Sequence, residues 1–434
     1  MADTTVVQPP KGVARTLQSH TLYGNIFAHC SPRSLLRFRR VSRAAQQAVQ
    51  DYMDRAFNVN KRLSRYFRDP LAFRSLQART AAIVSGSFAL QFFDRTYYPE
   101  SDLDIYTHPE RSLLDVGLYL QSEGYTFEPY SWQQGRWRDE VDQLCTRMNA
   151  HVDALENEDE VSELYDMKGT RAVYTFVRDP TPGAPAATTR KVQIIVARST
   201  PLRALLDFHS SMSSACTALA KHAKGLLWIP TASVLNIITY NAAYCLYPLA
   251  TLEAYTSLVL NGGNPGKVAA LEKYAKRGWR AISNPSPLIQ YLNPSLFYVG
   301  KSRWVCDEHT WTVPLSMEGV KPPPPSSPSS EALSWDPIAE CGWRLAYLSI
   351  PEGLVIAKFG IVATTVLRWG YTTGNAGYLG RLVSFFMSQG RLEHRKKPDE
   401  DSRVEDCTDV WTWWDETLPV FRTIYQADHD LMSD

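Results

Sequence analysis

Apolar residues occur in two kinds of spacing along this chain of 434 residues, and together they predict a mixed α and β protein. Short apolar or alternating runs predict β-strands, at residues 81–85, 103–106, 171–177 and 190–197. Apolar residues at helical spacing predict helices, at residues 88–94, 113–124, 201–222, 232–261 and 268–276. The last two strands flank a loop rich in proline, alanine and threonine, which predicts a β-hairpin with a long tip.

The N-terminal pattern predicts a small group of helices between residues 17 and 53. Two apolar clusters are expected there, formed by Leu22, Ile26 and Phe27 and by Leu35, Leu36, Phe38 and Val41. Ser31 is a plausible N-cap and Pro32 suits the first helical turn, so a new helix should begin between the clusters.

Composition shifts and proline-rich stretches divide the chain into an N-terminal tail, helical and α/β units, and a linker. The expected boundaries are a tail at 1–16, a helical segment at 17–60, an α/β domain at 61–215, a helical domain at 216–320, a Pro/Ser-rich linker at 321–331 and a helical C-terminal region at 332–434.

Charge and cysteine usage narrow the classes of function. The 46 basic and 45 acidic residues nearly cancel, so no overall field would attract nucleic acid or an anionic membrane. The seven cysteines include no CxxC pair, and the N-terminus lacks the apolar region of a secretory leader. We therefore expect free thiols, no membrane span, and a cytoplasmic or nuclear location.

Two carboxylates carry the first chemical signal. Asp102 and Asp104 stand two residues apart on a predicted strand, which places both on one face and directs Leu103 and Ile105 into a core. Carboxylates that close repel each other unless a cation lies between them, and Mg²⁺ prefers such hard oxygen ligands. We expect these two residues to bind metal.

A possible phosphate site precedes the acidic pair. Gly86 and Ser87 occupy a predicted strand-to-helix turn. Glycine lets a backbone approach a phosphate closely, and the free amides at a helix start attract anions. A phosphate cradle next to a metal site is what phosphoryl or nucleotidyl transfer needs.

These residues together resemble the nucleotidyltransferase superfamily of DNA polymerase beta, over roughly residues 80–200, and most closely fungal proteins of that type. The resemblance implies an α+β fold with a mixed sheet, and a two-metal Mg²⁺ site at Asp102 and Asp104. It also implies that Gly86 and Ser87 hold the triphosphate of an NTP. In that family a third carboxylate comes from a later strand, where this chain has Gln193, a poor metal ligand and no general base.

The segment from Thr21 to Arg43 carries a second resemblance, to the F-box, a helical module that binds a ubiquitin-ligase scaffold. The pattern is matched at Ile26, Pro32, Leu35, Leu36, Val41 and Ser42. The usual Leu-Pro-x-Glu start is replaced by Leu22-Tyr-Gly-Asn, and alanines stand where an aromatic residue is usual. An amphipathic helical cap on the neighbouring domain is the other interpretation.

Three hypotheses of function follow. The first is Mg²⁺-dependent transfer of a nucleotidyl group from an NTP to an acceptor hydroxyl, in an active or degenerate enzyme. The second is a non-catalytic F-box adaptor that receives substrates for a ubiquitin ligase through residues 17–60. The third is an inactive scaffold.

Overall fold

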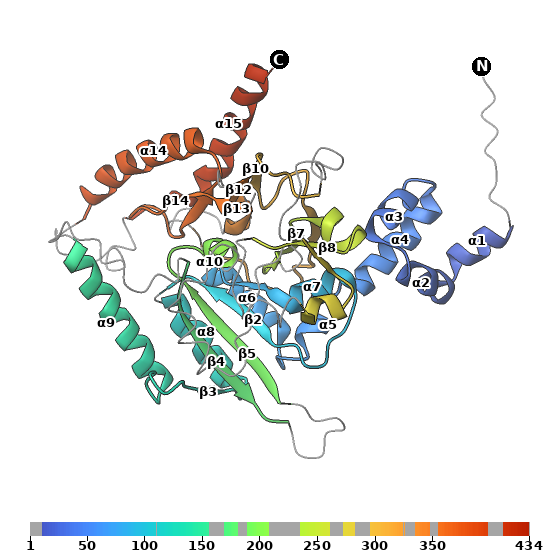
Figure 1. The fold of residues 1–434 in the computed structure, drawn as a ribbon, viewed down its shortest axis with the longest axis horizontal. Coiled ribbons are helices and arrows are strands. Elements are labelled where there is room, and N and C mark those ends of the chain that lie inside the picture. Colours follow the sequence, from blue (N-terminus) through green and yellow to red (C-terminus); the bar gives the residue numbers. More distant parts are fainter. Residues whose placement is uncertain are drawn as a thin grey trace.

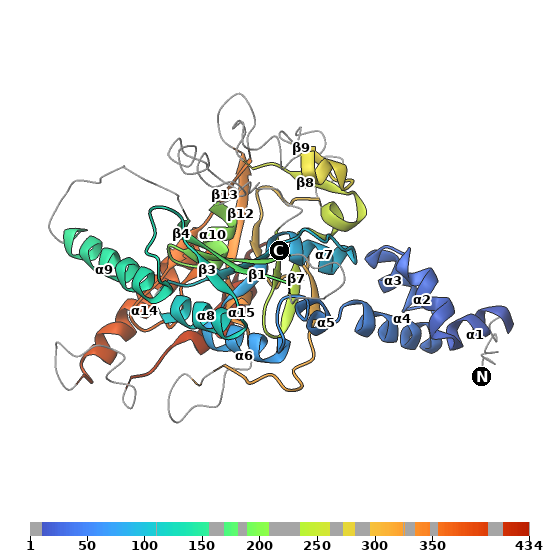
Figure 2. The same cartoon turned by 90° about the horizontal axis from the view of Figure 1, so that it is seen from below.

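The computed structural model describes most of the chain. The described residues are 11–109, 111–155, 169–180, 189–207, 235–260, 272–282, 296–323, 325, 335–347, 355–397 and 411–433. Figures 1 and 2 show a mixed α and β body from which the first four helices project at one end.

Helices form the N-terminal end, flank the sheet and close the chain. They are α1 (Lys11–Gln18), α2 (His20–Ala28), α3 (Pro32–Phe38), α4 (Arg43–Ala56), α5 (Val59–Leu63), α6 (Pro70–Thr80), α7 (Gly86–Asp94), α8 (Arg111–Ser122), α9 (Trp137–Leu155), α10 (Pro201–Asp207), α14 (Ala376–His394) and α15 (Leu418–Ser433). Short turns of other helix types are η2 (Leu249–Glu253), η3 (Pro337–Glu340) and η5 (Asp415–Thr417). Helix α1 begins inside the segment 1–16 that was expected to be a tail.

Fifteen labelled strands occur in the described residues. They are β1 (Ile83–Ser85), β2 (Leu103–Thr107), β3 (Thr126–Glu128), β4 (Thr170–Arg178), β5 (Arg190–Ala197), β6 (Asn236–Ile238), β7 (Ala242–Cys245), β8 (Thr256–Leu258), β9 (Arg280–Ile282), β10 (Ser302–Trp304), β11 (Trp311–Pro314), β12 (Gly342–Tyr347), β13 (Val355–Lys358), β14 (Gly360–Val362) and β15 (Tyr371–Thr373).

Eight of these strands form one mixed sheet, in the order β11-β7-β6-β1-β2-β5-β4-β3. Strands β2 and β5 run parallel, and every other neighbouring pair is antiparallel. The predicted hairpin is confirmed, since β4 and β5 pair antiparallel along most of their length. The long pair is visible as two green arrows in Figure 1.

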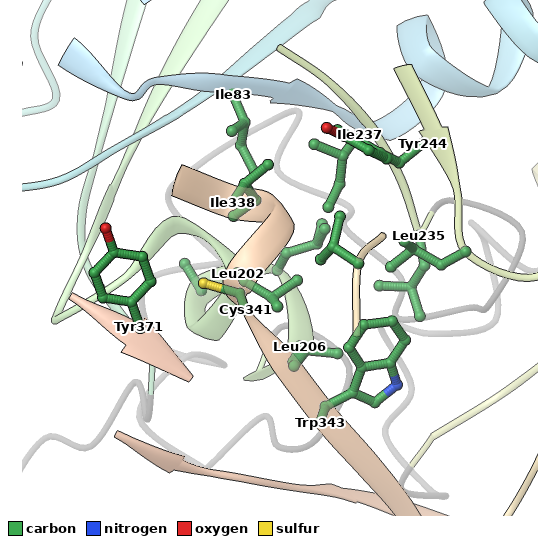
Figure 3. Close-up of a cluster of buried hydrophobic side chains, with 14 of the residues drawn as sticks. Ile83, Leu202, Leu206, Leu235, Ile237, Tyr244, Ile338, Cys341, Trp343 and Tyr371 are labelled. Atoms are coloured by element: carbon green, nitrogen blue, oxygen red, sulfur yellow. The ribbon is translucent and has the colours of Figure 1, made fainter. Parts of the chain in front are cut away.

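Each face of the sheet covers its own hydrophobic core. On one face Val84, Leu103 and Ile105 pack against helices α6, α7 and α8. The prediction that Leu103 and Ile105 point into a core is thus confirmed. On the other face a second cluster joins the sheet to α10 and the C-terminal strands, with Ile83, Leu202, Ile237, Ile338 and Trp343 among its members (Figure 3).

The helix predicted at 232–261 is wrong for most of the residues described there, where only the short η2 (Leu249–Glu253) is helical. Strands β6 and β7 form a hairpin in the central sheet, and β8 pairs with β9. Neighbouring residues Ile237 and Ile238 are buried in opposite cores. A strand covered on both faces is continuously apolar, so its local pattern cannot be told from that of a buried helix.

The helical domain expected at 216–320 is therefore not seen: its described part consists mainly of short strands, and β6, β7 and β11 complete the sheet of the preceding unit. The C-terminal region was also expected to be helical, but β12 to β15 precede the helices α14 and α15. Strand β12 pairs with the distant β10 as well as with β13. Among the described residues, no helix is long and apolar enough to cross a membrane.

Candidate functional site

Strand register gathers a row of polar residues across the core of the sheet. Ser85 on β1 lies opposite Asp104 on β2, Asp104 lies beside Gln193 on β5, and Gln193 lies opposite Thr175 on β4. Side chains at paired positions point to the same face. All four are buried, and we call them the polar row. Asp104 and Gln193 therefore lie side by side, as the sequence predicted.

Three side-chain atoms of the polar row have no hydrogen-bond partner in the described structure. They are Oδ1 of Asp104 and both amide atoms, Oε1 and Nε2, of Gln193. Orphaned buried polar groups cost free energy, and in native proteins they usually mark water, an ion or a functional constraint. Other buried side chains, such as Gln77 and Trp411, also carry an atom without a partner, so these three atoms alone do not distinguish the polar row from a structural site.

Asp102 lies at the edge of this row, immediately before β2. Its carboxylate is partly exposed, and its Oδ2 atom is 3.9 Å from Nζ of Lys191. Asp102 and Lys191 each stand two residues before the paired Asp104 and Gln193, just outside the paired part of the parallel strands. A lysine cation therefore already neutralises one of the two predicted metal ligands.

Burial shifts the pKa of both aspartates upward. For Asp104, burial and the neighbouring Asp102 charge raise the pKa well above its usual range, against the weaker opposing effects of Lys273 and Lys191. For Asp102, burial also raises the pKa, while Lys191, Lys273 and Arg65 act to lower it. The site thus favours a proton on Asp104 unless another positive charge is bound there.

The Gly86–Ser87 turn lies where the sequence predicted it, between β1 and α7. Gly86 has a φ of 69°, a left-handed conformation that glycine adopts without strain. The Ser87 hydroxyl is buried and 2.6 Å from the hydroxyl of Ser101. That hydroxyl is therefore occupied, and its assignment to a triphosphate stays a prediction.

Sequence reasoning missed the residues that hold this turn against the acidic segment. Gln91 donates from its side-chain amide to the Ser101 hydroxyl and to the Ser87 carbonyl, and it accepts from the amide of Tyr98. Tyr66 donates its hydroxyl to the carbonyl of Ser101. The spacing of Ser87 and Gln91, four residues apart on a helix, was the available signal.

The donor set does not fit the two-metal Mg²⁺ site implied by the resemblance. Within the described ranges, no group of three or more histidine, cysteine, aspartate or glutamate side chains is placed to hold a metal ion. Gln193 occupies the position beside Asp104, and Lys191 competes for Asp102. Two carboxylates and a neutral amide lack the charge that two divalent cations require.

The N-terminal helices form a separate site. Helices α2, α3 and α4 pack around Tyr23, Phe27, Leu35, Val49 and Tyr52. As predicted, Ser31 caps α3 by accepting from the Ser34 amide, and Pro32 is the first helical residue. Ser42 caps α4 in the same way.

The surface of these helices carries exposed apolar side chains. Leu22 is 49% exposed, Ile26 is 51% exposed and Val41 is 72% exposed. The predicted grouping is corrected here: Phe27 turns into the core whereas Leu22 and Ile26 face solvent, because residues 22 and 26 are one helical turn apart and 27 is not in line with them. Val41 likewise is exposed and does not pack with Leu35 and Phe38, with which it was grouped.

Comparison with known protein families decides the nature of this segment. Residues 21–54 match the F-box domain family. These residues form an F-box domain. No curated protein and no solved structure matches the chain significantly. No related protein therefore supports the nucleotidyltransferase resemblance. The family match covers the F-box, residues 21–54.

The F-box is tied to the body by specific polar contacts. Arg95, at the end of α7, donates to the carbonyls of Phe27 and Cys30 and to the hydroxyl of Tyr52. The amide of Arg33 donates to Glu253. Helix α4 of the F-box also leads directly into α5, which packs in the core of the central sheet. The F-box therefore has a defined orientation relative to the sheet.

Proposed function

We propose that this protein is an F-box adaptor that presents substrates to a ubiquitin ligase. The F-box implies Skp1 as the partner within an SCF ubiquitin ligase, and the α+β body would carry the surface that recognises the substrate. The observation that carries the proposal is the F-box match itself, together with the exposed Leu22, Ile26 and Val41. Such a role belongs in the cytoplasm or nucleus.

Exposure of these three side chains supports a docking role because the rest of the F-box is well packed. Tyr23, Phe27, Leu35, Val49 and Tyr52 fill its small core. Leu22 and Ile26 lie one helical turn apart on α2, so they offer a single apolar stripe, the form in which helices usually meet a partner. Burial of a side chain of this size stabilises a complex by about 1.5–3 kcal/mol.

Fixed attachment of the F-box supports the same function. A ligase adaptor must hold its substrate at a defined place relative to the ligase. The Arg95 hydrogen bonds and the continuous α4–α5 connection restrict rotation of the F-box about the body. A flexible tether between the two parts would not serve this purpose as well.

The direct test is the replacement Ile26→Asp. We expect its affinity for Skp1 to fall at least roughly thirty-fold, because a charge would enter the apolar contact. Isothermal titration with the full-length chain measures this change. Ile26 is exposed, so the thermal unfolding temperature should stay close to that of the wild type.

Ile424→Asp is the matched control, since Ile424 is 54% exposed on the distant helix α15. This variant should bind Skp1 like the wild type. Equal binding by the Ile26 and Ile424 variants, or no binding by the wild-type chain, would contradict the proposal.

Nucleotidyl transfer is the second candidate, favoured by one specific observation. The Gly86 turn, Asp104 and the orphaned amide of Gln193 are brought together by strand pairing rather than scattered over the surface. The residues present do not fit a two-metal Mg²⁺ site, so this geometry supports no transfer step through two metal ions.

Asp104→Asn tests this candidate. Folded Asp104 has a raised pKa, so wild-type stability should fall as pH rises from the ordinary aspartate value of about 4 through the raised value. The variant lacks that fall and should be more stable than the wild type at pH 8 in denaturant titrations. If the second candidate is right, the stable variant also loses NTP consumption that the wild type performs.

A wild-type chain that consumes no NTP in the presence of Mg²⁺ would eliminate the enzyme hypothesis. Lower stability of the Asp104→Asn protein than of the wild type at pH 8 would instead contradict the raised pKa of Asp104.

A further inference from the structure

A cluster of arginines follows the third helix of the F-box. Arg33 and Arg37 lie one turn apart on α3, Arg40 lies in the following turn, and Arg43 begins α4. All four are exposed, and we call them the arginine patch. Arg39, between them, is partly buried.

Basic residues outnumber acidic ones in the F-box. Residues 21–54 carry five arginines and two acidic residues, Asp51 and Asp54 near the end of α4, which gives a net charge of +3. The near-neutrality of the whole protein therefore conceals a basic F-box. Its local potential should attract anionic groups over about one Debye length, which is close to 8 Å at physiological salt.

One acidic side chain lies close to the patch, since Oε1 of Glu253 accepts from the backbone amide of Arg33 at 3.0 Å, but it forms no ion pair with the four guanidinium groups. Within the described ranges, no acidic side chain lies within ion-pair distance of any of the four guanidinium groups, whereas Arg55, Arg277 and Arg303 each have such a partner. Arg33 and Arg37 also form a like-charge pair at the i, i+4 spacing, which is weakly unfavourable in an isolated helix. The stability of the fold therefore does not explain why these four positions are arginines.

The composition of the surface favours a protein partner over nucleic acid. Val41, 72% exposed, stands between Arg40 and Arg43. The hydrogen bond from its amide to the Phe38 carbonyl holds it in the same compact turn. Arginine mixed with exposed apolar side chains is typical of protein interfaces, since guanidinium groups are weakly hydrated and pair with carboxylates in two-point contacts. A phosphate backbone offers no counterpart for the valine.

We propose that the arginine patch docks a carboxylate-rich surface of the ubiquitin-ligase subunit that the F-box binds. This inference rests on the proposed adaptor function. The apolar stripe of Leu22 and Ile26 would supply most of the lasting contact, while the patch accelerates encounter and orients the partner, as charges at the rim of an interface do.

The experiment measures association and dissociation rates of the full-length chain with Skp1 between low and high salt. The variant carries Arg33→Gln, Arg37→Gln, Arg40→Gln and Arg43→Gln. We expect its association rate at low salt to fall at least roughly ten-fold, with a smaller change in dissociation rate and a flatter salt dependence. The four side chains are exposed, so the unfolding temperature should not decrease.

The matched control is the double variant Arg391→Gln and Arg395→Gln. Both arginines are exposed and four residues apart, Arg391 in the last turn of α14 and Arg395 at its C-cap. It should associate like the wild type. If the wild type binds Skp1 at a rate that does not depend on salt, and the four-arginine variant binds at the same rate, this inference alone is overturned and the adaptor function stands. Wild-type failure to bind Skp1 overturns both. Binding of duplex DNA that depends on the same four arginines would show that the patch recognises nucleic acid instead of an acidic protein surface, and would overturn the inference.

Discussion

Replacing Arg74 by leucine should lower the free energy of unfolding by about 3–5 kcal/mol. Arg74 is fully buried on α6. Its guanidinium donates to the carbonyl of Tyr240 from two nitrogens, at 2.9 Å and 2.5 Å, and to the carbonyl of Ser316 at 2.7 Å. A third partner is the side-chain oxygen of Asn60.

The expected loss is large because the substitution leaves several buried acceptors without a donor. Burial lowers the pKa of Arg74 to about 10, so the side chain stays charged at neutral pH. Its carbonyl partners belong to the β6–β7 turn and to the segment after β11, both beyond the domain boundary expected from sequence. Arg74 thus joins α6 to the far half of the sheet.

Urea unfolding followed by tryptophan fluorescence measures this effect. Arg381→Leu is the control, because Arg381 is exposed and its ion pair with Asp428 lies at the surface. The control should change stability by less than about 1 kcal/mol. A similarly small change in the Arg74 variant would show that the sheet does not depend on this connection.

The second large effect is expected from Gln193→Glu. The substitution keeps the length of the side chain and places a carboxyl group beside Asp104, at a fully buried position. Two neighbouring buried carboxyls cannot both ionise without a counter-ion, so one must keep its proton. We expect the variant to be less stable than the wild type by about 3 kcal/mol at pH 8 and by much less at pH 5.

The sign of this pH dependence follows from the raised pKa of the introduced acid. The folded state binds its proton more tightly than the unfolded state, so stability falls as pH rises above the ordinary glutamate value of about 4. Thermal unfolding at the two pH values measures the fall. Added Mg²⁺ or Mn²⁺ should recover part of the loss at pH 8, because a cation can be shared by the three carboxyl groups.

Gln193→Met is the control for this position. It removes an amide whose polar atoms have no hydrogen-bond partner in the described structure, so its stability should be equal to or above that of the wild type. A Gln193→Glu protein that is as stable at pH 8 as at pH 5 would contradict the shared burial of residues 104 and 193. Stabilisation of this variant, but not of the wild type, by added metal would identify Gln193 as the residue that keeps the polar row from binding a metal ion.

Local signals in the sequence were sufficient for the short unit from Ile83 to Thr107. Gly86 marked the turn, and the alternation of Asp102, Leu103, Asp104 and Ile105 marked the two faces of β2. The β4–β5 hairpin could be predicted equally well, because apolar and polar residues alternate along both strands and a proline-rich stretch of sequence joins them. In each case the structure depends on contacts between residues close in sequence.

Only part of the F-box structure could be predicted from the sequence, for a physical reason. Its helix starts at Ser31 and Ser42 follow from capping chemistry. Which apolar side chains stay exposed depends on how three helices pack, and the helical spacing alone grouped Ile26 with the buried Phe27. The exposed residues, rather than the core, are those that support the proposed function.

By itself the sequence determined the turns, caps and alternation that build individual helices and strands, because those preferences act over one or two helical turns or a few residues of strand. Only the tertiary structure decided that residues 236–238 and 242–245 are strands, that β11 closes the far edge of the sheet, and that Gln193 lies beside Asp104. Those outcomes depend on pairing between segments separated by tens to hundreds of residues, where burial on both faces removes the periodic pattern that distinguishes a strand from a helix.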